Sequence, residues 1–253
     1  DAVAMTNGDQ LVTGANGAPS VAILLNDYSN GNDMVVAKSG IAKVADLKGK
    51  KIGVEVGFVS HLLLLNALKS AGLTEKDVTL VNVPTHETPQ ALQKGDVAAI
   101  VAWQPNSGQA LKLVPGSKAI FTSADVPGLI YDVLAVNPKS LAERRADWQK
   151  VVSVWFRITD YIKDPKNKDD VLKIMSARVG LTPAEYEPIT KGTFLLDAAG
   201  NAERFKPGEA LSSVVHSNKV VDKFNIDNGV YKQAQEPTQY LDSRLIAGQA
   251  SKP

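Results

Sequence analysis

The first half of this 253-residue sequence alternates short apolar runs with helical patterns, separated by short turns. KIGVEVG at 51–57 precedes the helical segment SHLLLLNALKSAG, and DVAAIVAW at 96–103 precedes NSGQALKLV. Alternating strands and helices predict βαβ units and a mostly parallel sheet. The strands are nearly continuously apolar, which favours burial on both faces. The sequence therefore predicts an α/β fold, with mostly parallel sheets flanked by helices.

The second half, after Pro138, is dominated by helical patterns. Between Trp148 and Ile162 the apolar residues recur at helical spacing, so Trp148 and Trp155 are expected in the core. The segment LTPAEYEPITKG has a helix start signal, with Thr182 as N-cap and Glu185 three residues later. We therefore expect a helical C-terminal half.

Composition and motifs argue against several classes of protein. The formal net charge is +1 with charges of both signs interspersed, which gives no basic patch for nucleic acid. The chain has no Cys and no apolar run long enough to span a membrane. It has no nucleophile elbow, phosphate-binding glycine loop or zinc-helix motif, and its three His residues lack metal-ligand spacing. We therefore expect no enzyme activity, no cofactor and no metal site.

The sequence begins with DAVAMTNGD, which reads as a buried strand without an initiating Met or a signal peptide. A chain rarely starts within a core strand. We therefore expect further sequence upstream.

Several stretches together resemble a known family. Four features occur here in the order typical of periplasmic solute-binding proteins. They are DLKGKKIGVEVG with its Leu-rich helix, DAVAMTNGD, GDVAAIVAWQP and the helical second half. The sequence is similar to the NMT1-like group, which serves ABC importers for nitrate, sulfonates, taurine and thiamine precursors. The resemblance implies a two-lobed periplasmic binding protein fold of type II. Lobe one would comprise residues 1–38 and 132–253 without its N-terminal strands, and lobe two would comprise 39–131.

The resemblance also implies the function. The chain would be the substrate-binding component of an ABC importer. It would capture a small polar nitrogen- or sulfur-containing solute, such as nitrate, a sulfonate, taurine, urea or guanidine, by hinge closure of two lobes. Its partners would be that solute and a membrane permease, with no nucleic acid, and the protein would act as a monomer. Its location would be periplasmic, or extracytoplasmic on a lipoprotein anchor.

Ligands of open α/β sheets collect beyond the carboxyl ends of the strands, and two such turns lie in the first sixty residues or so. Thr6 and Asn7 follow the first strand and could bind a ligand, or they could form a turn and a helix cap. Phe58, Ser60 and His61 follow strand 51–57. Ser60 also suits the N-cap of the next helix, and His61 could simply pack.

Two later turns add further candidates. Trp103 could stack on a ligand or attract a cation, and Gln104 offers amide donors and an acceptor. Asp132 lies in the apolar run LIYDVLAVN, where a carboxylate is costly to bury unless it is paired. It could meet a ligand amine or guanidinium, or accept hydrogen bonds from the hinge backbone.

The candidate residues favour a nitrogen compound over a bare anion. Members of the resembled family often carry small hydroxyl residues where this chain has Phe58 and Val59, whereas Asp132 offers a negative charge. We therefore expect a small neutral, zwitterionic or cationic nitrogen compound. Two alternatives stay open. One is an enzyme like the thiamine-pyrimidine synthases, although these carry a Cys-rich motif that this chain lacks. The other is a ligand-gated partner of a sensor.

Overall fold

The computed structural model describes residues 1–247 and divides the chain into two compact units. Unit 1 contains residues 1–29 together with the chain from residue 128 onward, and unit 2 contains residues 30–127. The strand β3, Met34–Ala37, pairs with the unit 2 strands β6 and β7, so it does not belong to the first lobe as the expected boundary at residue 38 had it. The second boundary likewise lies at 127/128 rather than 131/132.

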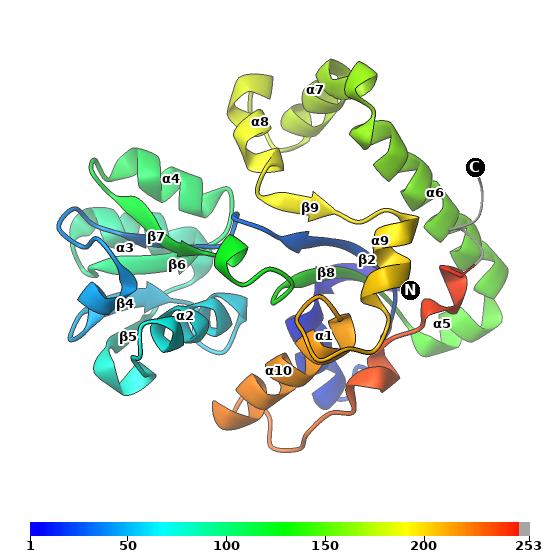
Figure 1. The fold of residues 1–253 in the computed structure, drawn as a ribbon, viewed down its shortest axis with the longest axis horizontal. Helices are drawn as coiled ribbons and strands as arrows, with labels where there is room; N and C mark the ends of the chain where they lie inside the picture. The colour runs from blue at the N-terminus through cyan, green and yellow to red at the C-terminus, as the bar shows by residue number, and fades with distance from the viewer. Residues whose placement is uncertain (248–253) are drawn as a thin grey trace. The chain divides into compact units, whose positions relative to one another are not determined.

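Unit 1 has a four-stranded sheet in the order β1-β8-β2-β9 (Figure 1). Its strands are β1 Ala2–Thr6, β2 Val21–Ser29, β8 Tyr131–Val136 and β9 Thr193–Leu195. Its α-helices are α1 Asn7–Ala15, α5 Pro138–Glu143, α6 Arg145–Lys163, α7 Lys168–Arg178, α8 Pro183–Thr190, α9 Ala198–Arg204 and α10 Val214–Asp227.

Unit 2 has a five-stranded sheet in the order β5-β4-β6-β3-β7. Its other strands are β4 Lys51–Val54, β5 Thr79–Asn82, β6 Ala99–Ala102 and β7 Lys118–Thr122. Its α-helices are α2 Val59–Ser70, α3 Thr88–Lys94 and α4 Asn106–Leu113. The strand-then-helix alternation predicted for 51–113 is therefore confirmed.

The strand pairing corrects the prediction of mostly parallel sheets. Among the strands of residues 1–247, five of the seven pairings are antiparallel, and the two parallel ones are β4 with β5 and β4 with β6. One inserted strand in each sheet accounts for four of the five, and the edge strand β9 accounts for the fifth. β1 and β2 run in the same direction, as a βαβ unit requires, but β8 lies between them in the opposite direction. β3 likewise lies antiparallel between β6 and β7.

One apolar cluster of unit 1 contains buried residues of β2, β8 and α6. On α6, Val152 and Phe156 are buried, and Trp148 and Trp155 pack partly buried against the same cluster, as the helical spacing predicted. The capping box of Thr182 and Glu185 is also confirmed at the start of α8. The C-terminal half is not wholly helical, because β9 adds an edge strand to the sheet beside β2.

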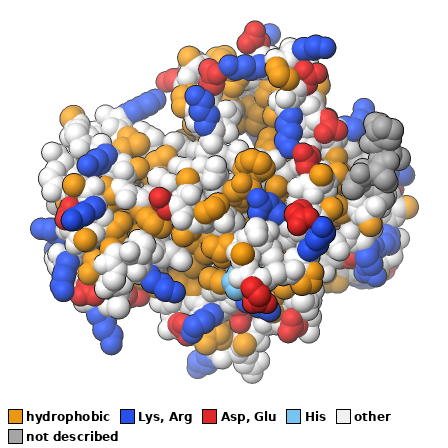
Figure 2. Space-filling model, viewed as in Figure 1, with side chains coloured by type: hydrophobic (Ala, Val, Ile, Leu, Met, Phe, Trp, Pro, Cys, Tyr) orange, Lys and Arg blue, Asp and Glu red, His pale blue; other side chains and the backbone are white. Residues whose placement is uncertain are grey.

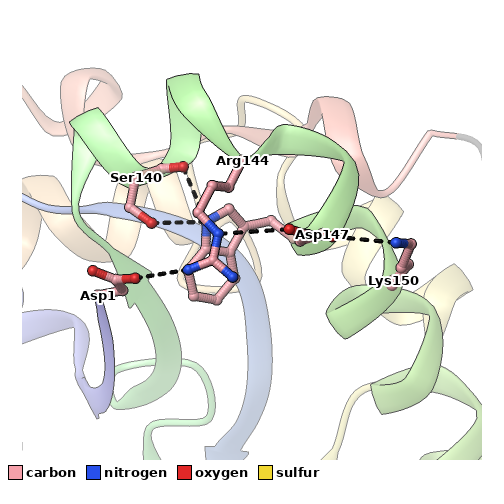
Figure 3. A network of polar contacts seen from close by, with 6 residues as sticks. Asp1, Ser140, Arg144, Asp147 and Lys150 are labelled. Atoms are coloured by element: carbon pink, nitrogen blue, oxygen red, sulfur yellow. Dashed lines mark hydrogen bonds and ion pairs between the residues drawn. The ribbon is translucent and has the colours of Figure 1, made fainter.

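Ionic and hydrogen-bonding contacts connect the first residue to the junction of α5 and α6 (Figure 3). The Arg144 guanidinium lies 3.1 Å from the Asp1 carboxylate and 3.5 Å from that of Asp147. Lys150 forms a second ion pair with Asp147, at 3.2 Å. The Ser140 hydroxyl accepts a hydrogen bond from the Trp148 indole nitrogen. These exposed pairs each contribute little stability.

Charged side chains of both signs are interspersed on the visible face (Figure 2). Within residues 1–247, none of the helices combines the length and the apolar character needed to cross a membrane.

Candidate functional site

In unit 1, the turn from β1 into α1 holds the first two candidate residues. Thr6 is the N-cap of α1, since its hydroxyl accepts a hydrogen bond from the Asp9 backbone N–H at 3.0 Å. The same hydroxyl lies 2.8 Å from an Asp9 carboxylate oxygen and donates to it. Thr6 therefore has a capping role in this structure, and its contact with a ligand stays a prediction.

Asn7 is 2% exposed, and its side-chain amide is hydrogen-bonded on both sides. Its Nδ2 donates to Ser217 Oγ at 3.1 Å and to Asn218 Oδ1 at 2.9 Å. Its Oδ1 accepts from the Tyr131 backbone N–H at 3.2 Å. The amide thus joins the start of α1 to β8 and α10. A ligand contact by Asn7 stays a prediction, and it would have to replace one of these bonds.

Asp132 lies in the middle strand of three, with Thr6 opposite it on β1 and Asp27 opposite it on β2. Burial raises the pKa of the Asp132 carboxyl above its ordinary value, whereas a hydrogen bond with Asp27 lowers it, and the nearby charge of Asp9 raises it further. Two carboxyl groups therefore meet on one face of the sheet beside the start of α1. Such an arrangement favours a positively charged group.

The prediction from sequence missed Asp27. Its signal resembled that of Asp132, because Asp27 is also a carboxylate in a strand-like apolar run, AILLNDY. Only the register of β2 against β8 shows that the two carboxyl groups are neighbours.

In unit 2, the turn after β4 holds three more candidates. Gly57 has a φ of +87°, which favours glycine and redirects the chain into α2. Phe58 is the N-cap residue, 49% exposed, and provides no side-chain cap. Ser60 lies within α2 and is not the N-cap, so that interpretation is wrong. Its buried hydroxyl has no hydrogen-bond partner among the described residues, and its contact with a ligand stays a prediction.

His61 is buried at the start of α2 and is held from two directions. Its Nδ1 accepts a hydrogen bond from the Gly57 backbone N–H at 3.3 Å. Its Nε2 lies 3.3 Å from a Glu75 carboxylate oxygen. Burial lowers the pKa of the imidazole, and the Glu75 carboxylate partly opposes that change. His61 is thus buried and held in place at the start of α2, and its contact with a ligand stays a prediction.

Trp103 and Gln104 follow β6, and both are half-buried. α4 starts at Asn106, with Pro105 as its N-cap residue. The Gln104 amide lies against Gly108, where a Cβ would come within 2.6 Å of the amide oxygen. Glycine at position 108 therefore leaves the space that the Gln104 amide occupies.

In each unit, the candidates lie on or follow neighbouring strands of one sheet. In unit 1, Thr6, Asn7 and Asp132 gather where β1 leads into α1. In unit 2, β4 and β6 are parallel neighbours, so the turns that contain Ser60 and Trp103 follow the same edge of one sheet. That edge is the carboxyl edge, where α/β sheets bind ligands. Within residues 1–247, no group of three or more His, Cys, Asp and Glu side chains is placed to hold a metal ion.

Comparison with known proteins yields consistent similarities. Residues 1–176 match the NMT1-like family. The "Putative aliphatic sulfonates-binding protein" of Escherichia coli K12 is 43% identical over 219 residues, which is 84% of this chain and 65% of that protein. The "Taurine-binding periplasmic protein" of the same organism is 32% identical over 248 residues, or 93% of this chain and 73% of that protein.

The similarity extends to solved structures. The periplasmic aliphatic sulphonate binding protein SsuA from Escherichia coli superposes with a TM-score of 0.79, covering 98% of this chain and 81% of that chain at 20% identity. This likeness establishes the two-lobed α/β fold. Matched regions can be much shorter than the relatives themselves: four Brucella binding-protein sequences match over only 94 residues, about 30% of their length.

Proposed function

The chain belongs to the NMT1-like family, and from that membership we propose that it is the solute-binding component of an ABC importer. The relatives named above are binding proteins for aliphatic sulfonates and for taurine. The observation that carries the proposal is the placement of polar groups at strand ends in both units. Thr6 and Asp132 lie at one such place, and Ser60 and Gln104 at another.

The solute we propose is small and carries a positively charged nitrogen, as an ammonium, amidinium or guanidinium group does. The support is the pair formed by Asp132 and Asp27, with Asp9 close by. The hydrogen bond between Asp132 and Asp27 requires a shared proton, and a cationic group of a solute would take the place of that proton. A zwitterion also fits, and taurine, named in one relative, has an ammonium group of this kind.

The other candidates offer further groups that a solute could contact. The unpaired hydroxyl of Ser60 would accept or donate a hydrogen bond, and the Gln104 amide can do both. The indole of Trp103 would offer a flat apolar face that attracts cations. Phe58, half-exposed at the start of α2, would supply apolar contact. The imidazole of the buried His61 would add contact where a solute reaches it. Asn7 would hold the β1–α1 turn in position.

The partners and location follow from the same proposal. A binding component of this kind would deliver its solute to a membrane permease, and its place would be the periplasm or the outer side of the membrane. The protein would act as a monomer.

A thermal-shift panel tests the proposal. The panel adds one compound at a time to the protein: guanidinium, urea, small amines, taurine, alkanesulfonates and nitrate. A ligand at 100 times its Kd stabilises the folded state by about 2.7 kcal/mol. We expect stabilisation by a cationic or zwitterionic nitrogen compound, and its loss in Asp132→Asn but not in the exposed control Asp160→Asn.

Two outcomes would contradict parts of the proposal. Stabilisation by alkanesulfonates and nitrate alone, unchanged in Asp132→Asn, would refute the cationic solute and retain the binding role. The absence of a shift with every compound in the panel would argue against the binding of any of these solutes.

A further inference from the structure

Arg204, the last residue of α9, is half-buried and lies over an aromatic pair. The centre of its guanidinium group is 4.3 Å from the ring centroid of Tyr28 and 5.8 Å from that of Tyr131. Its Nη1 donates to the Tyr131 hydroxyl at 2.9 Å and to the Ser212 carbonyl oxygen at 3.4 Å. These contacts fix the guanidinium group in one orientation.

The rest of the guanidinium group is uncommitted. Among residues 1–247, no carboxylate forms an ion pair with Arg204, and its Nε and Nη2 make no hydrogen bond. Partly buried arginines in proteins are usually paired with an anion, because burial of an unpaired charge is costly. The open edge of Arg204 therefore has donors in the fork geometry that matches a carboxylate or sulfonate.

A cavity of about 320 Å³ lies beside Arg204, within unit 1. Phe194, Leu196 and Pro207 give it apolar walls, and Ser212 and Ser213 give it polar ones. Its other two charged lining residues, Glu203 and Lys206, are ion-paired with each other at 2.6 Å. Arg204 is thus the charged lining group that still lacks a counter-ion.

Phe194 adds a flat apolar surface. The residue is 47% exposed, although its ring stacks on that of Tyr28 with centroids 4.9 Å apart and an interplanar angle of 25°. An exposed aromatic ring held by stacking beside an unpaired guanidinium group suits a ligand with an apolar body and an anionic end.

This place is separate from the unit 1 residues of the proposed solute site. Tyr131 and Asp132 are consecutive on β8, so their side chains point to opposite faces of the sheet. Tyr28 and Asp27 alternate in the same way on β2 and pair with Tyr131 and Asp132, respectively. Arg204 contacts the tyrosine face, and the carboxyl pair lies on the other.

We propose that the Arg204 cavity is a second binding site, for a small organic anion with a flat apolar body. The carboxylate or sulfonate of this anion would meet Nε and Nη2 of Arg204, and its body would lie against Phe194. The proposal does not depend on the identity of the solute at Asp132.

Calorimetric or ligand-observed NMR titration with benzenesulfonate tests the second site. Its neutral analogue, benzenesulfonamide, serves as the matched probe. We expect saturable binding of benzenesulfonate that weakens by about tenfold or more in Arg204→Gln, the size typical for loss of charge-assisted hydrogen bonds. Arg157→Gln, an exposed arginine of the same unit, should leave its Kd unchanged. Weak binding of the sulfonamide should differ little among these proteins.

A second variant covers the case in which Arg204→Gln does not fold. Phe194→Ala removes an exposed ring, and we expect it to weaken benzenesulfonate binding at least threefold, by loss of aromatic contact. The proposal is wrong if benzenesulfonate does not bind saturably to the unaltered protein. It is also wrong if folded Arg204→Gln, or Phe194→Ala in its place, retains the original Kd.

Discussion

The substitution Asn7→Ala separates a structural role for Asn7 from a role in ligand binding. Removal of this amide leaves the Tyr131 backbone N–H and Asn218 Oδ1 without the partners that they have in the structure. The Ser217 hydroxyl retains its bond to the Leu129 carbonyl oxygen at 3.2 Å. Each buried group left unsatisfied costs about 1–3 kcal/mol, so the loss is about 2–6 kcal/mol. We expect the lower half of that range, because water can enter the space left by the side chain.

Urea unfolding measures this loss, through the midpoint at constant m-value and in the absence of any ligand. Asn16→Ala is the matched control, since Asn16 is exposed at the other end of α1 and donates to the Val12 carbonyl oxygen. That control should lose less than about 1 kcal/mol. An Asn7→Ala protein as stable as the control would refute the structural role, and a loss of solute affinity alone would then assign Asn7 to the ligand.

Three further predictions concern stability. Gly128 has a φ of +85°, and a Cβ there would lie 2.3 Å from the Leu211 carbonyl oxygen. Gly128→Ala should therefore lower the free energy of unfolding in urea by about 2–4 kcal/mol. A loss below about 0.5 kcal/mol would contradict this expectation. Two arginines beside Asp242 lower its pKa from 3.8 to about 2, so its stabilisation is complete above pH 4 and disappears as the pH falls towards 2. Asp242→Asn should therefore lose about 1–2 kcal/mol at pH 7 and nothing near pH 2, and an equal difference at both pH values would be inconsistent with the ion pair. Burial raises the pKa of Asp132, so ionisation of its carboxyl destabilises the fold as the pH rises through that pKa. In the absence of ligand, Asp132→Asn should therefore raise the Tm at pH 7 more than at pH 4. A lower Tm of the variant at pH 7 would contradict this expectation.

Features that depend on local sequence could be predicted. The Leu-rich segment predicts α2, the capping box of Thr182 and Glu185 predicts α8, and the apolar spacing predicts the buried face of α6. Each of these signals lies within the segment that it describes. The α/β class also follows, since alternating strands and helices specify βαβ units.

Features that depend on distant pairing could not be predicted. Nothing near 131–136 indicates that β8 lies between β1 and β2, and the same holds for β3 between β6 and β7. That insertion makes most pairings antiparallel. It also brings Asp27 beside Asp132, so this part of the candidate site appears only when the register is known.

Side-chain roles were harder to predict than positions. The Ser60 prediction identified a residue at the right end of α2 but assigned it to the cap, and the hydroxyl is in fact buried without a partner. Asn7 was found at a strand end, but its bonds run to α10, about two hundred residues away in sequence. Arg204 carried no local signal, because its meaning depends on Tyr28 and Tyr131 from two other segments.

Isothermal titration calorimetry with the nitrogen compound that gives the largest thermal shift tests the central claim most directly. The account predicts one solute per chain, and an affinity that falls by about tenfold or more in Asp132→Asn, as expected for loss of a charged hydrogen-bond partner. Binding that is unchanged in Asp132→Asn, or no saturable binding of any solute in the panel, would contradict it.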